Sequence, residues 1–259
     1  MHRFFTEPKN VTIFPRDDTT PVTDPIGQIV IAGDDFHHLI HVLRIAHDER
    51  FEVCDGAGTD FICHIKEVLD DHLLAEIDIV NYSRGELPFK LTLFQGIPKG
   101  KKLDEIIQKG TELGYTSFVP FTAERTVNRP KNADFKKTIR RGRIAYEAAK
   151  QAGRGIIPSV EEPLADINVV AKMLAGYDLV LLAHVGEGNP GLHTVLQAFG
   201  KTPDNAAVII GPEGGFTEIE VLTLQNAGAR VVSLGTRVMR TETAGPALGA
   251  MLAYAFGLV

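Results

Sequence analysis

The first third of the chain consists mainly of short hydrophobic segments that are typical of β-strands. Apolar and β-branched residues dominate each segment, and turn signals such as Asp55-Gly56 separate them. The strand-like segments, between residues 26 and 80, are IGQIVI, ERFEVCDG, DFICHIKEVL and HLLAEIDIV. One helix is predicted among them, because Asp34 or Asp35 can cap the amphipathic segment FHHLIHVLR. The pattern predicts a small β-barrel.

The rest of the chain alternates apolar strands with helices. The polar segment NYSRGELP at residues 81–88 precedes it, so we predict one domain over residues 1–84 and another over 85–259. Strands are predicted at LTLFQGI, TSFVPF, YDLVLLAHV, AAVIIG and ARVVSLG. Such near-continuous apolar runs are typical of parallel strands that are buried on both faces. The alternation therefore predicts an α/β domain with a parallel sheet and helices on both faces.

Two glycine-containing loops follow successive predicted strands. The first is IIGPEGGFTEIEV at residues 209–221, where Thr217 and Glu220 form a capping box, and the second is SLGTRVMRTETAG at residues 233–245. The carboxyl ends of parallel strands share one sheet edge, and glycines let backbone approach a ligand closely. We expect one pocket suited to a flat, neutral ligand such as adenine, with Arg240 and Glu242 at its rim. Ordinary strand-to-helix turns and a surface ion pair are the simpler alternatives.

Two other patterns indicate ligand sites more weakly. The segment GEGNPG at residues 186–191 matches the dinucleotide fingerprint, but Pro190 removes an N–H and no acidic residue ends the next strand. His37 and His41 have a spacing that a helix can use for zinc, but no third ligand follows. We therefore expect neither a nicotinamide or flavin site nor a metal.

The distribution of charge changes this picture. A net charge of −6 argues against a nucleic-acid partner, yet residues 99–154 contain 14 of the 27 Lys and Arg residues and only 6 Asp and Glu. Much of this positive charge lies on a helix predicted over residues 134–151. Lys and Arg in such a cluster suit phosphate contacts. A solvated helix face is the alternative.

The remaining features indicate a cytoplasmic protein. Cys54 and Cys63 form no motif and are typical of reduced, packed thiols. The first residues, MHRFFTEPKN, lack the apolar run of a signal peptide. The apolar C-terminal segment is interrupted by Gly245, Pro246 and Gly249 and is too short to span a bilayer, so we expect a buried helix and no membrane contact.

Several segments together resemble the ribosomal RNA small subunit methyltransferase E family, which belongs to the SPOUT class. The likeness runs from His37 to Ala244, and Thr236, Val238-Met239 and Tyr115 are its mild departures. The carrying segments are HHLIHVLR, KGKKLDEIIQKGTELGY, ERTVNR, EAAKQAGRGIIPSVEEP, IIGPEGGFTEIEV and VSLGTRVMRTETA.

The resemblance implies a fold, a cofactor and partners. It implies a C-terminal trefoil knot that holds S-adenosylmethionine, a homodimer that packs on the knot, and an N-terminal PUA-like RNA-binding β-barrel. It implies no metal. The implied activity is methylation of ring nitrogen N3 of one uridine in 16S (small-subunit) ribosomal RNA, within an assembled subunit.

The resemblance also implies site residues. Glu242 or Glu213 would accept the N3 proton, and Arg240 would stabilise negative charge on the uracil oxygens. Leu182 and Met239 would pack against the adenine faces. The full cofactor set is Leu182, Gly211, Pro212, Gly214, Gly215, Ser233, Leu234, Gly235, Val238, Met239, Thr241, Thr243 and Ala244. The expected RNA-binding set is Arg3, Arg44, Lys99, Arg125, Arg140, Arg141, Arg143 and Arg154.

Other functions stay open at this point. A methyltransferase of this class could act on another RNA site, and a non-catalytic RNA- or ribosome-binding protein could keep the knot as a scaffold. The residues do not choose between the two glutamates as the base, and they do not assign catalytic groups to one subunit of a dimer.

Overall fold

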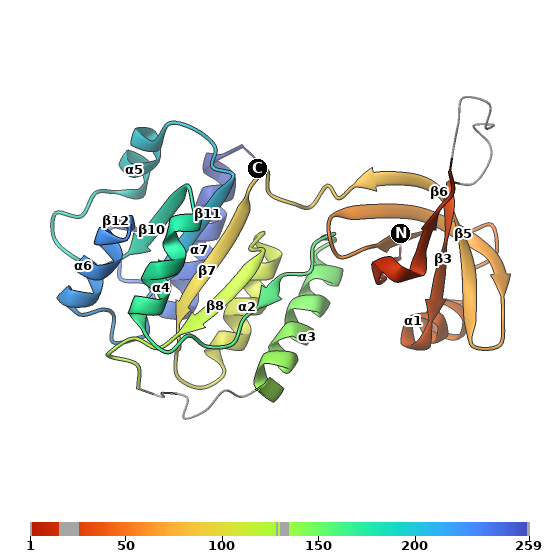
Figure 1. Cartoon of the computed structure of the whole chain (residues 1–259), viewed down its shortest axis with the longest axis horizontal. Helices are drawn as coiled ribbons and strands as arrows, with labels where there is room; N and C mark the ends of the chain where they lie inside the picture. The colour runs from red at the N-terminus through yellow and green to blue at the C-terminus, as the bar shows by residue number, and fades with distance from the viewer. Residues whose placement is uncertain (1, 16–25, 128, 130–134, 258–259) are drawn as a thin grey trace. The chain divides into compact units, whose positions relative to one another are not determined.

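The computed structural model describes residues 2–15, 26–127, 129 and 135–257. The chain forms two compact units (Figure 1). The first contains the residues up to Glu86 together with Gly153–Ile157, and the second contains Leu87–Ala152 and the residues from Pro158 onward. The predicted domain boundary at residue 84 placed the short segment Gly153–Ile157 in the second domain, whereas in the structure this segment belongs to the first unit.

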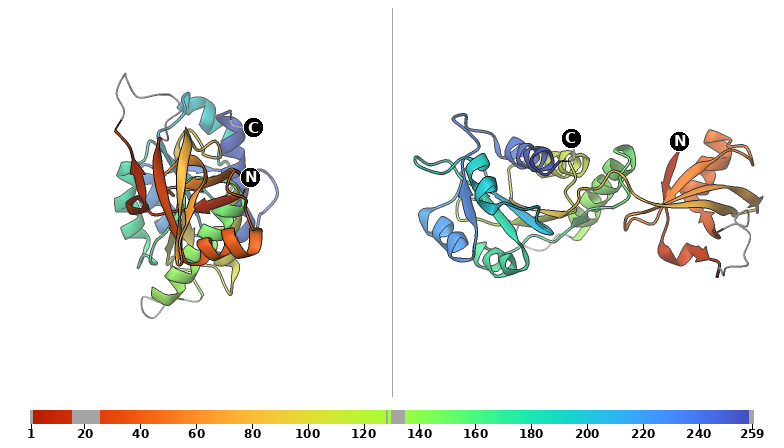
Figure 2. Two further views of the ribbon diagram at one scale, coloured as in Figure 1. Left: turned by 90° about the vertical axis from the view of Figure 1, so that its right-hand side faces the viewer. Right: turned by 90° about the horizontal axis from the view of Figure 1, so that it is seen from above.

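The first unit is built on a six-stranded, strongly curved sheet (Figure 2). Its strands follow the order β1-β4-β5-β6-β3-β2, and only the β1/β4 pair is parallel. The strands are β1 (Arg3–Phe5), β2 (Val11–Ile13), β3 (Gly27–Ala32), β4 (Phe51–Cys54), β5 (Thr59–Val68) and β6 (His72–Tyr82). Alternate strand residues such as Ile29, Val53 and Ile77 fill the core, as a half-buried sheet requires.

The helical segment of this unit begins earlier than its sequence predicts. The segment comprises α1 (Gly33–His37) and a π-helical turn, η2 (His38–Leu43). A separate 3-10 turn, η1 (Pro8–Asn10), lies between β1 and β2. The expectation that Asp34 or Asp35 caps the helix is wrong, because both residues lie in its first turn and Ala32 occupies the cap. Gly33 makes the earlier start possible with a φ of 65°, a conformation that favours glycine.

The second unit contains the predicted parallel sheet. All neighbouring strands are parallel, in the order β12-β10-β11-β7-β8-β9. The strands are β7 (Lys90–Gly96), β8 (Ser117–Phe121), β9 (Ser159–Val160), β10 (Leu179–Ala183), β11 (Asn205–Ile210) and β12 (Arg230–Val232). The short strand β9 was not predicted, since two residues carry no readable periodicity.

Helices cover both faces of this sheet, as its apolar strands require. On one face lie α2 (Lys102–Glu112), α3 (Phe135–Gln151), α5 (Leu192–Phe199) and α7 (Thr241–Ala255). On the other lie α4 (Ile167–Met173), the 3-10 turn η3 (Leu174–Gly176) and α6 (Glu218–Asn226). The helix α3 agrees with the predicted basic helix, whose expected first residue, Asp134, lies outside the described residues.

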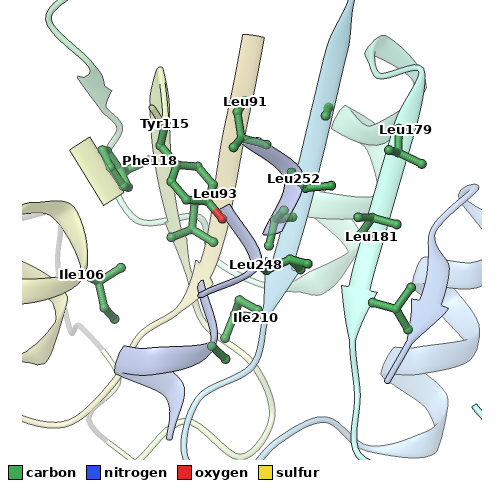
Figure 3. Packing of buried hydrophobic residues seen from close by; sticks show 14 of the residues in the cluster. Leu91, Leu93, Ile106, Tyr115, Phe118, Leu179, Leu181, Ile210, Leu248 and Leu252 are labelled. Carbon is green, nitrogen blue, oxygen red and sulfur yellow. The ribbon is translucent and has the colours of Figure 1, made fainter. Parts of the chain in front are cut away.

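The apolar C-terminal helix α7 is buried against the sheet, as predicted. Leu248 and Leu252 pack with Leu93 in one cluster (Figure 3). The hydroxyl of Tyr115 donates a 2.7 Å hydrogen bond to the Gly245 carbonyl, and a Cβ on Gly249 would come within 2.5 Å of the Tyr115 ring. Tyr115, a departure from the family pattern, therefore attaches α7 to the sheet.

The route from β12 to α7 passes the loop that follows β10. The backbone N–H of Ser233 donates to Pro190 O at 2.8 Å, and Leu192 N–H donates to Ser233 O at 3.3 Å. From the edge strand β12 the chain then returns to pack α7 over β7 and β11. Within the described residues, no helix is both long and apolar enough to cross a membrane.

Candidate functional site

The two predicted loops meet at one edge of the parallel sheet and are joined by a buried hydroxyl. Thr241, the first residue of α7, donates a 2.7 Å hydrogen bond to the carbonyl of Gly211 in the loop after β11. It accepts a 2.8 Å hydrogen bond from the Gln95 side chain at the end of β7. Thr241 was expected to contact a cofactor, but its hydroxyl is engaged in joining three segments of the site.

The loop after β11, GPEGG at residues 211–215, is held in place by close backbone approaches. A Cβ on Gly96 would lie 2.5 Å from Pro212 Cδ, and one on Gly214 would lie 2.8 Å from Arg125 Cβ. Arg125 donates to the Gly214 carbonyl at 3.2 Å. Gly215 has a φ of 66°, a conformation that other residues rarely adopt. The glycines therefore meet requirements of this loop that a larger residue would not.

The helix after this loop starts as predicted. Thr217 and Glu220 form the expected capping box at the start of α6. Glu220 is also buried and accepts a 2.8 Å hydrogen bond from Glu124 N–H. One carboxylate thus fixes both the helix start and the neighbouring segment that carries Arg125.

The loop after β12 presents exposed backbone at the same sheet edge. Gly235 has a φ of 107° and donates its N–H to the Ser233 hydroxyl at 3.3 Å. Val238 is 75% exposed, while Met239 and Leu234 are partly buried against the α7 side of the sheet. Backbone and apolar surface are therefore available to a ligand here.

A lysine and two carboxylates form the most polar part of this edge. The Lys102 ammonium lies 3.0 Å from Glu213 Oε1 and 3.2 Å from Glu242 Oε2. Lys99 N–H donates to the same Glu213 oxygen at 3.1 Å. Arg240 lies 3.9 Å from Glu242 Oε1 and is 81% exposed. The structure thus brings together all three residues that were expected to be catalytic.

Lys102 was missed as a site residue. It lies in the basic run KGKK at residues 99–102, which is part of the family pattern, but only Lys99 of this run was assigned a role. The run directly follows β7, at the same edge as the glycine loops. Its position after a central parallel strand was the signal that could have identified it.

The cluster keeps its groups charged near neutral pH. Burial opposes ionisation of Glu213, but hydrogen bonds from Lys102 and from backbone N–H groups outweigh it and lower the pKa of this carboxyl. The pKa of Glu242 is lowered by its own backbone N–H in the first turn of α7 and then by Lys102. The carboxylates of Glu213 and Glu242 next to its ammonium raise the pKa of Lys102. The edge therefore presents ionised carboxylates, which can accept a proton, and cations, which can stabilise negative charge.

Two of the expected cofactor side chains lie in the core. Leu182 is fully buried among the residues on the α4 and α6 side of the sheet, whereas Met239 packs on the α7 side. Since the two side chains pack on opposite sides of the sheet, the expectation that they enclose one adenine ring is not supported. In the first turn of α7, Ala244 is buried and Thr243 is exposed.

The expected RNA-binding residues divide into free and engaged cations. Arg44 and Arg143 are exposed, and Lys99 and Arg125 lie at the candidate site. Arg140 and Arg141 both pair with Asp104 of α2, at 2.6 and 3.3 Å. Arg140 stays 54% exposed, whereas Arg141 is mostly covered.

Arg154 and Arg3 are corrections to the expected RNA surface. The Arg154 side chain is 2% exposed and pairs with Glu86, which also accepts from the N–H groups of Gly155 and Ile156. Arg3 is 10% exposed and pairs with Glu52 and Asp60. A buried arginine needs such a partner, so these two residues are engaged within the first unit and do not face a ligand.

No group of three or more His, Cys, Asp and Glu residues suited to a metal occurs among the residues that the structure describes. His37 and His41 do lie together, with ring centroids 4.9 Å apart, but without further ligands. The burial of Cys54 and Cys63 raises the pKa of both thiols.

Comparisons with known proteins agree with this arrangement. The model of an RNA methyltransferase domain matches residues 85–253, and that of an RNA methyltransferase PUA domain matches residues 31–78. Ribosomal RNA small subunit methyltransferase E from Bacillus subtilis is 34% identical over 219 residues, which cover 83% of this chain and 85% of the relative.

Two solved structures share the fold over nearly the full chain. The ribosomal RNA small subunit methyltransferase E of Neisseria gonorrhoeae, bound to S-adenosyl methionine, has a TM-score of 0.77 at 26% identity and covers 99% of this chain and 98% of its own. A putative methyltransferase of Legionella pneumophila, in complex with the same cofactor, has a TM-score of 0.72 at 26% identity and covers 98% of this chain and 97% of its own. These findings confirm the expected fold class, a parallel α/β methyltransferase domain with helices on both faces and an N-terminal PUA domain. The chain belongs to the ribosomal RNA small subunit methyltransferase E family.

Proposed function

We propose that this protein methylates ring nitrogen N3 of one uridine in 16S (small-subunit) ribosomal RNA, with S-adenosylmethionine as the methyl donor. The observation that carries the proposal is the contact of Lys102, Glu213 and Glu242 beside two glycine loops at one sheet edge. Family membership and the cofactor named in the two related structures support the donor. The reaction takes place in the cytoplasm.

The residues at this edge fit S-adenosylmethionine. The cofactor supplies an electrophilic methyl group on a sulfonium. The backbone of residues 211–215 and 233–235 offers hydrogen-bonding groups to adenine and ribose, while Val238 and Met239 offer apolar surface. Thr241 keeps these two loops together through Gly211.

Glu242 is the better of the two candidate bases. Glu213 Oε1 already accepts from Lys99 N–H and is paired with Lys102, so it is anchored. The Lys102 contact of Glu242 Oε2 is an ion pair without hydrogen-bond alignment, and the nearest cation to its Oε1 is Arg240 at 3.9 Å. Glu242 is therefore freer to take a proton from N3 of the uridine.

The chemistry assigns one role to each group. The uridine N3 atom forms its bond to the methyl carbon while the carbon–sulfur bond breaks and its electron pair stays on sulfur. Glu242 takes the N3 proton, and Arg240, with 81% of its side chain exposed, stabilises negative charge on the uracil oxygens. The target uridine leaves its stack to reach the methyl group.

Binding of the ribosomal RNA uses exposed cations. Arg44, Arg140 and Arg143 contact phosphates of an assembled subunit, since exposed cations give affinity without reading sequence.

Dimer formation uses an apolar groove. Helices α5 and α7 line this groove, which includes Leu196, Met251 and Tyr254, and Tyr254 is 75% exposed. We propose that a second copy of the chain covers this groove, forming a homodimer through the knot.

The test is methyl transfer to a defined nucleotide. The purified protein is incubated with labelled S-adenosylmethionine and small ribosomal subunits that lack the modification, and the label is mapped by nuclease digestion and mass spectrometry. A single N3-methyluridine is expected. Label on another nucleotide would contradict the target, and the absence of both label and S-adenosylmethionine binding would favour a non-catalytic RNA-binding protein.

A further inference from the structure

Lys102 occupies a position that the proposed chemistry does not yet use. It is the first residue of α2 and reaches Glu213 in the loop after β11 and Glu242 in the first turn of α7. Both carboxylates follow Lys102 by more than 100 residues in the chain, and the ammonium contacts both. Its side chain is 30% exposed, against 29% for Glu213 and 16% for Glu242.

The surroundings make Lys102 the main cation of both carboxylates. From α7, Arg240 approaches Glu242 only to 3.9 Å. From the segment after β7, Lys99 contributes its backbone N–H to Glu213. Arg125 directs its guanidinium to the Gly214 carbonyl, and Asp104 of α2 is engaged by Arg140 and Arg141. Without the Lys102 charge, two carboxylates would share one small region, and repulsion would favour protonation of one of them.

We propose that Lys102 is a positioning residue for methyl transfer, which holds the Glu242 carboxylate ionised and in place, with Glu213 as its second anchor. The proposal rests on the proposed function. When Glu242 accepts the N3 proton, the ammonium keeps Glu213 as a charged partner, so its charge stays paired throughout the step. The role of Glu213 is therefore to provide a carboxylate partner for Lys102, and Glu213 is not the base.

The experiment compares three variants with the wild-type enzyme. Lys102→Met removes the charge, Lys102→Arg keeps it, and Lys109→Met removes an exposed charge from the same helix away from the cluster. For each protein, single-turnover methyl transfer to unmodified small subunits is measured from acid to neutral pH. Affinity for S-adenosylmethionine is measured by calorimetry, and thermal melting reports folding.

For Lys102→Met we expect a rate near neutral pH at least ~10-fold below wild type, with the acid limb of the pH profile moved to higher pH. Affinity for S-adenosylmethionine should stay within about 3-fold, because the lysine acts on the transfer step. Lys102→Arg should keep the wild-type acid limb and most of the rate, and Lys109→Met should match wild type throughout.

Three results would overturn this role. They are a wild-type rate and acid limb in Lys102→Met, a loss of rate that is equal at every pH, or a Lys102→Arg variant that is as slow as Lys102→Met. If Lys102→Met does not fold, the acid limb of Lys102→Arg decides, since a guanidinium that left Glu242 unpaired would move it upward. Wild-type protein that labels no RNA would instead refute the proposed function, and with it this role, before any variant is compared.

Discussion

The hydroxyl of Thr241 donates a 2.7 Å hydrogen bond to the backbone carbonyl of Gly211, across 30 residues of sequence. The same hydroxyl accepts from Gln95, so the end of β7, the loop after β11 and the start of α7 share one buried oxygen. Because Glu242 follows Thr241 directly, this contact also sets the position of the proposed base relative to the GPEGG loop. A small side chain outside the chemistry thus determines the geometry of the site.

Replacing Thr241 with valine should therefore affect stability and cofactor binding together. Thr241→Val keeps the shape of the side chain but removes the hydrogen bonds to the Gly211 carbonyl and from the Gln95 amide. Their loss should lower the free energy of unfolding by about 1–3 kcal/mol. Affinity for S-adenosylmethionine should fall as well, since Gly211 belongs to the proposed adenine loop. Urea unfolding and calorimetry measure the two effects.

Thr223→Val is the matched control for this change. The Thr223 hydroxyl donates only within its own helix, to Ile219 O at 2.8 Å, so its loss should change stability by no more than about 0.5 kcal/mol. If Thr241→Val behaved like this control in both assays, the buried hydroxyl would not be what joins the loops.

The close approach of Gly96 to Pro212 gives a second prediction. In Gly96→Ala the new Cβ would lie 2.5 Å from Pro212 Cδ and 2.6 Å from its nitrogen, and backbone must move to relieve this contact. We expect a loss of about 1–3 kcal/mol in the free energy of unfolding, as for other overpacked sites. Denaturant unfolding measures it, and weaker binding of S-adenosylmethionine would show that the loop has shifted.

The opposite sign is expected for the same substitution on α3. A Cβ on Gly142 would meet nothing within 4 Å, and the residue is helical, so Gly142→Ala should raise stability by about 0.5–1 kcal/mol. Equal unfolding curves for Gly96→Ala and wild type would mean that the Pro212 loop yields without cost.

The sheet and the site edge could be predicted from sequence because their signals are local. Runs such as YDLVLLAHV indicate doubly covered parallel strands directly, and loops that follow such strands must share an edge. Glu213, Arg240 and Glu242 were therefore grouped correctly. The capping box at Thr217 was equally readable, since its two members are three residues apart.

The features that sequence did not predict depend on contacts between distant segments. Arg154 has the composition of a surface cation, and only Glu86, 68 residues earlier, makes its burial possible. Leu182 and Met239 were assigned to one adenine ring, but they belong to segments that are distant in the chain and pack on opposite sides of the sheet. Lys102 acquires its role from two carboxylates that no spacing along the chain connects to it.

Arg240 should matter for turnover and hardly at all for folding. Its side chain is 81% exposed and makes no capping bond to α7, although its backbone occupies the cap position. Arg240→Ala should therefore melt like wild type while single-turnover methyl transfer falls by roughly 10²-fold, the scale of losing one group that stabilises developing charge. Arg237→Ala, three residues earlier in the same exposed loop, is the control and should retain its rate. Full turnover in a correctly folded Arg240→Ala protein would remove Arg240 from the mechanism.

The basic helix gives the last prediction, because its cations are not equivalent. Arg141 is mostly covered by its pair with Asp104, whereas Arg143 is exposed on the same helix. Arg143→Glu should weaken binding to the small subunit and reduce the slope of log affinity against log salt by about 1–2, since one phosphate contact is lost and a repulsive charge is added. Lys172→Glu, an exposed reversal on α4 across the sheet, makes the same change in net charge and should leave the slope unchanged. Equal effects of the two reversals would show that net charge alone, and not a surface on α3, governs binding to RNA.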